Sequence, residues 1–263
     1  MKHITKFIFL LSALFIFGCY PNEKPINETK YDQAYDRIIA TGVLKVGYVT
    51  YPPGLVKDPN TGELSGVVYE AVERIGKSLN LKVVWTEEVA WGTMIEGLNA
   101  NRYDIIGSPV WANSTRGKVA NFSTPLYYSG IGVYTRTNDE RFDDDLSKIN
   151  SANTKISVID GEMASMIANA DFPNAQQLSL PQLSDVSQLM LDVTSGKSDV
   201  TFVEPYLANQ YLKSNPGTLK NIANEAPIRI FANSLMFGKK EYALKSMLDI
   251  AIQEQLNSGE VEK

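Results

Sequence analysis

Alternating apolar and polar residues predict strands and helices that take turns along the chain. Residues 43–49 place Leu44, Val46 and Tyr48 on one side, as a half-buried strand does. Apolar residues at 68, 71, 72, 75 and 79 then form the buried stripe of an amphipathic helix. By the same two patterns we expect further strands at 82–86, 104–106, 131–135, 155–159, 175–180, 200–203 and 228–231. Further helices are expected at 31–40, 91–100, 162–170, 186–193 and 241–257, and one more that begins at Pro205.

This order of elements predicts an α/β fold in two lobes. Strands that are joined to the next strand through a helix form a parallel, doubly wound sheet. The chain runs through such a cycle twice, and its 263 residues leave room for two lobes of roughly 100 residues each. We predict lobe 1 at 36–134 and 232–263 and lobe 2 at 135–231, with two strand crossings that make a hinged clamp.

The first residues of the chain have the features of an export signal. Lys2 and Lys6 precede apolar runs at 7–11 and 14–17. A basic start followed by a short apolar core is typical of a signal peptide. The core is too short to span a bilayer as a permanent helix. We therefore expect residues 1–18 to be removed on export.

The end of this segment, Ile16-Phe17-Gly18-Cys19, resembles a bacterial lipobox. In a lipobox the cysteine is lipidated and becomes the mature N-terminus, and Cys19 is the only cysteine of the chain. The alternative is an ordinary signal peptide with an incidental cysteine. Lipidation of Cys19 would anchor the protein to a membrane from the periplasm or the cell surface. A tether at 19–35, poor in apolar residues and carrying two prolines at 20–30, would then act as a spacer.

The charge balance and the lack of histidine exclude several classes of function. Without Lys2, Lys6 and His3, the mature chain has 23 basic against 30 acidic residues, a net charge of −7, and no histidine. An acidic chain does not suit nucleic acid, which basic patches bind. Without histidine, and with Cys19 acylated, the chain cannot build a Ser-His-Asp triad, a Cys-His pair or a zinc site with such ligands. We expect no cofactor and no metal ion, since the spacing of an EF-hand loop is also missing.

The stretch from Tyr103 to Tyr128, YDIIGSPVWANSTRGKVANFSTPLYY, carries the main functional signal. We expect its apolar start to be a buried strand that breaks at Gly107-Ser108-Pro109, ahead of the isolated Arg116. A strand end followed by small and polar residues and one arginine suits the capture of an anion at the carboxyl edge of a sheet. The stretch resembles the signature of the bacterial family 3 solute-binding proteins, the periplasmic amino-acid-binding type. The resemblance extends along nearly the whole mature chain and implies a type II periplasmic-binding-protein clamp.

The resemblance also implies which residues bind the ligand. Arg116 matches the arginine that holds a ligand carboxylate, and Glu204 matches the acid that takes an ammonium group. Tyr51 and Trp91 match the aromatic residues that enclose the ligand side chain. Trp111 is a further candidate wall, because its loop has no regular apolar period that would bury it. Three of them have a plainer alternative: Arg116 could lie at a helix end on the surface, Glu204 could stabilise a helix dipole, and Trp91 could belong to the core.

The chain departs from the family pattern at two places. Hydroxyl residues common in the arginine loop are replaced by Pro109, Trp111 and Asn113, although Ser108 remains. Gly161-Glu162 stands where the family has Gly followed by Ser or Thr at a helix start that offers bare N–H groups to a carboxylate. A glutamate there competes with an anion or repels it. We therefore expect a small ligand that bears an amine, either a cation or a zwitterion, bound by Tyr51, Trp91, Ser108, Pro109, Trp111, Arg116, Gly161, Glu162 and Glu204.

The function that the resemblance implies is capture of a small-molecule ligand for an ABC importer. Hinge strands near 134–136 and 228–230 would bring Arg116 and Glu204 to opposite sides of one ligand. We expect a monomer that binds the membrane through its lipid and the transporter permease. A sensory binding protein and a structural lipoprotein with a degenerate cleft are alternatives. A third is an enzyme of the cyclohexadienyl dehydratase branch, with Glu162 as general acid, although a carboxylate at a helix N-terminus usually has a lowered pKa.

Overall fold

One continuous mixed sheet runs through both lobes of the protein. The computed structural model describes residues 32–259. Its ten-stranded sheet follows the order β4-β1-β5-β12-β7-β10-β8-β9, with β6 paired to β12 and β11 paired to β7. The strands are β1 (Val43–Tyr48), β4 (Lys82–Glu88), β5 (Ile105–Trp111), β6 (Ala120–Phe122), β7 (Tyr127–Arg136), β8 (Lys155–Ile159), β9 (Gln176–Leu180), β10 (Val200–Val203), β11 (Leu219–Asn221) and β12 (Arg229–Gly238). A separate hairpin consists of β2 (Val56–Lys57) and β3 (Leu64–Ser65).

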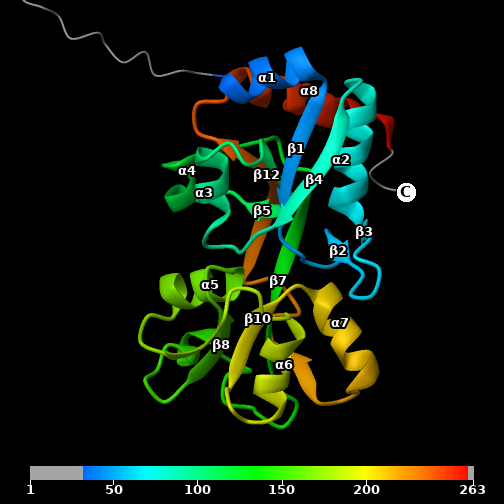
Figure 1. Ribbon diagram of the computed structural model, residues 1–263. Coiled ribbons are helices and arrows are strands. Elements are labelled where there is room, and N and C mark those ends of the chain that lie inside the picture. The colour runs from blue at the N-terminus through cyan, green and yellow to red at the C-terminus, as the bar shows by residue number, and fades with distance from the viewer. Residues whose placement is uncertain (1–31, 260–263) are drawn as a thin grey trace, which may run out of the picture. The chain divides into compact units, whose positions relative to one another are not determined.

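The helices cover the two ends of this sheet. They are α1 (Gln33–Thr41), α2 (Val67–Ser78), α3 (Met94–Asn99), α4 (Ser114–Gly117), α5 (Met163–Asp171), α6 (Ser187–Thr194), α7 (Pro205–Ser214) and α8 (Tyr242–Ser258), with a 3₁₀ turn at Leu146–Ile149. In Figure 1, α1, α2, α3, α4 and α8 lie around the strands of lobe 1, and α5, α6 and α7 lie around those of lobe 2. The predicted α/β two-lobe fold is confirmed.

Lobe 1 has a core on each face of its strands. The predicted stripe of α2, with Val72 and Ile75, packs with Leu44 and Val46 of β1 and with Leu248 of α8. The residues that follow along the strands point to the opposite face, because side chains alternate in a strand. There a second cluster holds Met94, Tyr103, Ile106, Val110 and Met236.

Lobe 2 has a core of its own. It contains Ile156 and Val158 of β8, Ile167 of α5, Leu189 of α6 and Phe202 of β10. β8 and β10 were expected at the residues where they are found, and Pro205 begins α7 as predicted. Separate cores are what two lobes require in order to move as rigid bodies. The lobe boundaries given above stay a prediction.

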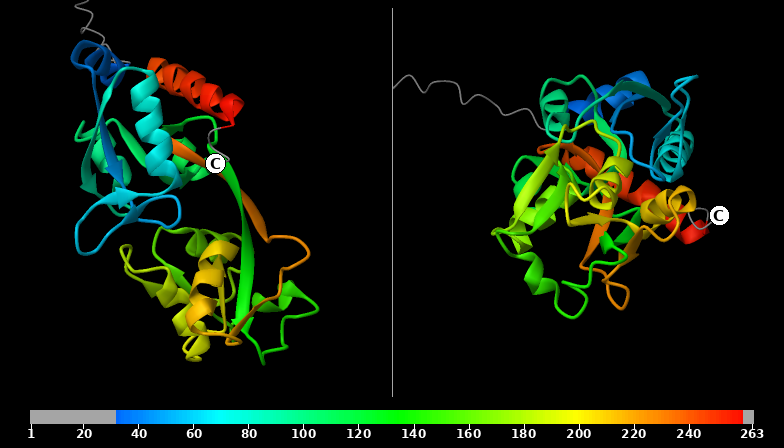
Figure 2. Two further views of the ribbon diagram at one scale, coloured as in Figure 1. Left: turned by 90° about the vertical axis from the view of Figure 1, so that its right-hand side faces the viewer. Right: turned by 90° about the horizontal axis from the view of Figure 1, so that it is seen from below.

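Two antiparallel strands connect the lobes. β7 pairs with β12 through residues 127–131, and from Gly132 onward it pairs with β10 of lobe 2. Figure 2 shows β7 and β12 running side by side from one half of the described chain to the other. The change of partner falls at Ile131 and Gly132, a few residues before the segment at 134–136 that the sequence indicated as the hinge.

The prediction that the strand breaks at Gly107-Ser108-Pro109 is wrong. β5 continues to Trp111, which is therefore a strand residue and not part of a loop. Proline lacks an N–H group and interrupts a ladder of hydrogen bonds. Here the ladder between β5 and β12 shifts register between Ser234 and Met236, opposite residues 107–109. Because of this irregularity, the ladder requires no N–H group from Pro109, and β5 continues through it.

The other differences concern the lengths of elements. α3 is limited to Met94–Asn99 within the predicted 91–100, and α4, β6 and β11 were not predicted. α1 begins at Gln33, inside the range 19–35 expected for the tether. The export signal and Cys19 lie outside the described residues. Within 32–259 no helix combines the length and the apolar character needed to cross a bilayer.

Candidate functional site

Most of the predicted ligand-binding residues meet in one small cavity where the two lobes face each other. It has a volume of about 10 Å³, and its lining consists of Tyr51, Trp91, Pro109, Trp111, Arg116, Glu162 and Met163. Residues 51–116 of this set belong to lobe 1, and Glu162 and Met163 to lobe 2. A space of this size holds one water molecule at most. We call this place the inner site.

Arg116 reaches from lobe 1 to lobe 2. The short helix α4 positions it, since the Asn113 side chain caps the helix and accepts from the Arg116 N–H at 2.9 Å. The guanidinium donates from Nη1 to the Trp111 carbonyl at 3.2 Å and from Nη2 to the Gly161 carbonyl at 3.1 Å. Its Cζ lies 6.0 Å from the centre of the Trp91 ring. Burial lowers the pKa of Arg116 to about 10, with Glu162 acting in the opposite direction, so the group stays charged at neutral pH.

Glu162 is the N-cap of α5 and is only 3% exposed. Its Oε2 accepts from the Ala164 N–H at 2.8 Å, as a capping carboxylate does. Its Oε1 is buried without a hydrogen-bond partner in the described chain. Burial raises its pKa to about 7, although the Ala164 and Met163 N–H groups act in the opposite direction. The lowered pKa expected at a helix start is thus overturned, because desolvation outweighs the cap.

Glu204 immediately precedes α7 and is 5% exposed. Burial raises its pKa, and a hydrogen bond from Ser129 acts in the opposite direction. Its Oε1, like that of Glu162, has no partner within the described residues. Its charge raises the pKa values of both Tyr51 and Glu162, so the three groups lie close enough to interact. Glu204 itself lines a neighbouring cavity of about 380 Å³ that also contains Tyr127 and Ser129.

Two aromatic rings close the inner site. Tyr51 and Trp91 meet edge to face, with ring centres 5.8 Å apart and planes at 79°. Tyr51 is 3% exposed, and its hydroxyl is buried without a hydrogen-bond partner in the described part of the chain. Burial, followed by the charges of Glu204 and Glu162, raises the pKa of Tyr51 well above its usual value, so the phenol keeps its proton.

Trp111 and Ser108 are held inside the structure. The Trp111 ring stacks on Phe231 at 4.3 Å between centres, and its Nε1 donates to Asn233 Oδ1 at 2.8 Å. Ser108 does not line the inner site. Its hydroxyl accepts from the Val49 N–H at 2.7 Å and donates to the Val49 carbonyl at 2.8 Å, which connects β5 to the end of β1.

The polar atoms of the inner site have a common property. The Tyr51 hydroxyl and one oxygen of Glu162 have no partner there among the described residues, and one oxygen of Glu204, in the neighbouring cavity, has none either. Buried polar groups in native proteins are nearly always hydrogen-bonded, so unpartnered ones indicate a missing partner. Glu162 beside the Arg116 guanidinium, with Glu204 near enough to act on Glu162, favours a guest that donates hydrogen bonds and carries positive charge. Residues 32–259 contain no group of three or more Asp, Glu, His or Cys side chains that could hold a metal ion.

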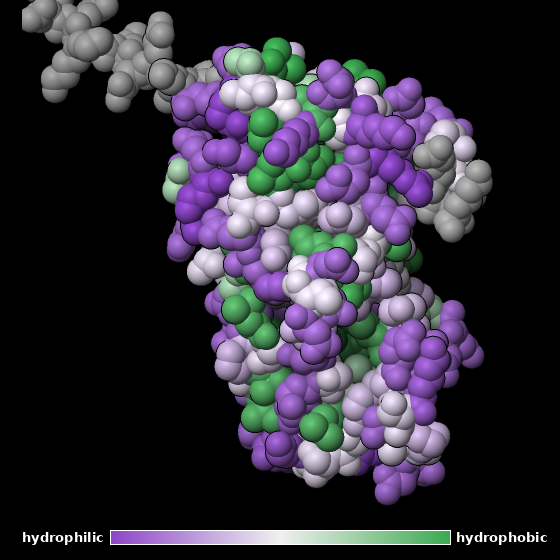
Figure 3. All heavy atoms as spheres, turned by 45° about the vertical axis from the view of Figure 1, so that its right-hand side comes forward, coloured by the Kyte–Doolittle hydropathy of each residue, from purple (hydrophilic) through white to green (hydrophobic). Residues whose placement is uncertain are grey.

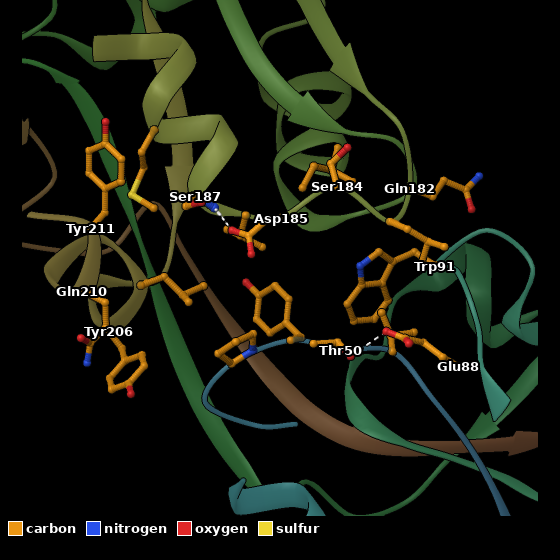
Figure 4. A pocket seen from close by; sticks show the side chains of 18 of the residues that line it. Thr50, Glu88, Trp91, Gln182, Ser184, Asp185, Ser187, Tyr206, Gln210 and Tyr211 are labelled. Atoms are coloured by element: carbon orange, nitrogen blue, oxygen red, sulfur yellow. Dashed lines mark hydrogen bonds between the residues drawn. The ribbon is translucent and has the colours of Figure 1, made fainter. Parts of the chain in front are cut away.

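A larger cavity of about 560 Å³ adjoins the inner site, and we call it the outer cavity. Tyr51 and Trp91 line both spaces. Figure 4 shows Thr50 and Glu88 on one wall of the outer cavity and Asp185 on the facing wall, with Tyr206 and Gln210 from α7 at its side. Figure 3 shows a hollow with apolar atoms between the two halves of the described chain, below a largely hydrophilic upper surface.

The comparison with protein families agrees with this geometry. Residues 44–263 match the family described as bacterial extracellular solute-binding proteins, family 3. The chain belongs to this family. Its members bind small-molecule ligands and work with ABC transporters.

Individual relatives of this family 3 protein are moderately similar. A probable amino-acid ABC transporter-binding protein of Haemophilus influenzae is 29% identical over 191 residues, which cover 72% of this chain and 70% of that protein. The L-cystine-binding protein TcyA of Bacillus subtilis is 26% identical over 82% of this chain and 77% of its own. The crystal structure of an ancestral amino acid-binding protein, a precursor of cyclohexadienyl dehydratase, has a TM-score of 0.74 at 20% identity, covering 87% of this chain and 96% of that one. At this identity the likeness concerns the fold alone.

The family 3 signature did not reveal the residues that support the site from β7 and β12. Asn233 receives the Trp111 indole N–H and donates from Nδ2 to Ser129 Oγ at 2.9 Å. Ser129 in turn donates to Glu204. Ser129 and Asn233 are 104 positions apart, so only the β7–β12 pairing brings them together. In the sequence, the one available sign of this role was that each of them is a polar residue within an apolar strand.

Proposed function

We propose that this protein captures a small amine-bearing or amino-acid-like ligand at the inner site and delivers it to an ABC importer. The observation that carries the proposal is the buried set of Arg116, Glu162 and Glu204, with unpartnered carboxylate oxygens, at the place where the lobes face each other. Solute-binding proteins close around their ligand by rotation about a hinge. In this protein the ligand would replace the hydrogen-bond partners that these oxygens lack.

Closure would bend β7 and β12 where they pass between the lobes. Three contacts already join the lobes: Arg116 to Gly161, Gly92 to Gln182, and Asn113 to Met166. The small volume of the inner site and these contacts support the interpretation that the chain is in a closed form. A ligand would enter when the lobes move apart and would be enclosed when they return.

The proposal includes attachment to a membrane. Export through residues 1–18 and lipidation of Cys19 would hold the protein at the cell surface or in the periplasm, where family members meet their ligands. We propose that it acts there as a monomer. The dehydratase alternative is not favoured by the comparisons, in which the relatives described above are binding proteins. A sensory role would use the same inner site with another partner.

The proposal is tested by titrating the purified mature domain with amines and amino acids. We expect a change in tryptophan fluorescence, since Trp91 and Trp111 line the inner site, and a rise in melting temperature. Glu204→Gln should weaken binding about tenfold to a hundredfold, because it removes the charge of a buried acceptor, and hydrogen bonds to charged groups contribute about 1.5–3 kcal/mol. Arg116→Ala should weaken binding by a similar factor, because it removes the charge-assisted hydrogen bond to the Gly161 carbonyl that joins the lobes.

The matched control is Asp144→Asn. Asp144 lies on the surface of lobe 2, where it pairs with Lys148 at 2.7 Å, and its replacement should leave binding unchanged. A tightly bound dianion, with no response to any amine or amino acid, would show that the inner site does not work as proposed.

A further inference from the structure

We propose that the ligand is an elongated amine with two cationic groups and no carboxylate, one cation bound in the inner site and the other in the outer cavity. This inference rests on the proposed function, since it names the class of ligand for the same site.

The two groups that could hold a carboxylate are already engaged. Arg116 directs both Nη atoms at backbone carbonyls, those of Trp111 and Gly161. The N-terminus of α5 is occupied by Glu162, whose carboxylate accepts from the Ala164 N–H. A ligand carboxylate would have to displace Glu162 from the helix end or lie beside it. Like charges placed side by side in a buried site cost several kcal/mol.

The unfilled hydrogen-bonding capacity of the inner site, and of Glu204 in the neighbouring cavity, is mostly that of an acceptor. Glu162 and Glu204 each have one buried oxygen without a partner in the described chain. Both residues are more than nine-tenths buried, so the missing donor has to come from a bound molecule and not from bulk water. An ammonium group offers three donors and one positive charge. It therefore supplies what both carboxylates lack, and the Tyr51 hydroxyl can turn its proton away and accept as well.

The outer cavity is acidic. Among the described residues that line it, the charged ones are Glu88 and Asp185. Glu88 pairs with Lys57 at 2.8 Å near the rim. Asp185 accepts from the Ser187 N–H at 2.8 Å, and Figure 4 shows its carboxylate directed into the cavity. Asp185 is therefore the acid most available to a second cation, and the rings of Tyr206 and Tyr211 beside it add faces that attract cations.

Tyr51 and Trp91 form the junction between the two spaces. Because these rings line both, a chain that leaves the inner site toward the outer cavity passes between aromatic surfaces, which suit methylene groups. Among the described residues, the charged ones that line a second groove beside Arg116 are Arg116 and Arg229, and Arg229 is paired with Asp171, so that groove offers no carboxylate to a second cation. The charges of the two spaces therefore direct a dication toward the outer cavity.

The test compares probes that differ by one group, using calorimetry on the mature wild-type protein. Cadaverine is lysine without its carboxylate, agmatine is arginine without its carboxylate, and pentylamine is cadaverine without its second amine. We expect cadaverine to bind at least about tenfold more tightly than lysine, and agmatine to bind at least about tenfold more tightly than arginine. Lysine and arginine have to place a carboxylate beside Glu162, and the two amines do not. Pentylamine should bind about fivefold more weakly than cadaverine, because it lacks the contact with Asp185.

The variant Asp185→Asn locates the second cation. It should lower the affinity for cadaverine about fivefold and leave the affinity for pentylamine unchanged. The control variant Asp144→Asn should change neither affinity. Tighter binding of lysine or arginine than of the matching amines would overturn this inference and leave the proposed function standing. Equal effects of Asp185→Asn on cadaverine and pentylamine would overturn the assignment to the outer cavity. If neither amines nor amino acids bind, the proposed function itself fails.

Discussion

Glu162 combines two roles whose effects on its charge oppose each other. As the N-cap of α5 it accepts hydrogen bonds, which favour the ionised carboxylate. As a buried wall of the inner site it lies near Glu204, and burial favours the protonated form. The pKa of about 7 shows that burial dominates. The charge of Arg116 acts in the opposite direction, but it lowers the pKa of Glu162 by less than burial raises it.

This pKa predicts how stability depends on pH. The folded pKa of Glu162 is about 7 and its usual value is 4.5, so between these pH values the folded state holds a proton that the unfolded state has lost. The contribution of Glu162 to stability therefore falls as pH rises through this window, by about 1.4 kcal/mol per pH unit, and is constant above it. Glu162→Gln removes the effect. The melting temperature of the variant minus that of the wild type should therefore be larger at pH 8 than at pH 5.

Thermal melts of both proteins at several pH values between 5 and 8 measure this difference. Glu63→Gln, on the exposed loop between β2 and β3, is the matched control. Parallel curves for wild type and Glu162→Gln would contradict the raised pKa of this buried carboxyl group. A cationic ligand stabilises the ionised form, so binding near pH 6 should also release protons.

At the scale of the elements, sequence periodicity identified the strands and helices but not how strands meet. The stripe of α2 and strands β8 and β10 follow from local spacing, because each buries one face that its own residues define. β5 could not be foreseen in the same way. Gly107-Ser108-Pro109 has the composition of a turn, and only the irregular pairing with β12 lets the strand continue. The partner that tolerates Pro109 lies more than 100 residues further along the chain.

The hydroxyl of Ser108 is part of what holds this irregular strand in the sheet. It satisfies both the N–H and the carbonyl of Val49, all in a buried position. Ser108→Ala would leave both groups unpartnered, which should lower the free energy of unfolding by about 1–3 kcal/mol. Urea denaturation measures the loss. Ser65→Ala, at an exposed position of β3, should change it little, and equal stability of both variants would argue against the bridging role.

At the scale of the whole molecule, the resemblance to the family predicted ligand-binding residues, whose role stays a prediction, and periodicity indicated two lobes. Tyr51, Trp91, Arg116 and Glu162 meet as expected. The sequence could not reveal that Arg116 is bonded to carbonyl oxygens or that Trp111 is supported by Asn233. Both facts depend on β7 and β12 lying together and on how closely the lobes approach.

The approach of the lobes can be tested at Gln182. Its Oε1 accepts from the Gly92 N–H at 3.0 Å, a contact between lobe 2 and lobe 1. Gln182→Ala removes a hydrogen bond that exists only when the lobes meet, so it should weaken ligand binding about threefold to fivefold. Folding of each lobe does not use this bond, and the melting temperature of the free protein should be unchanged. Gln177→Ala is the matched control, because Gln177 bonds Asn169 within lobe 2.

Gln182 also lines the outer cavity, and the probes separate its two roles. A contact that stabilises the closed form contributes equally to every ligand that is enclosed, because closure is the same step for each. Pentylamine and cadaverine should therefore lose affinity by the same factor in Gln182→Ala. If only cadaverine is weakened, Gln182 acts by contacting the distal amine. The comparison thus decides whether this side chain stabilises closure of the lobes or selects the ligand within them.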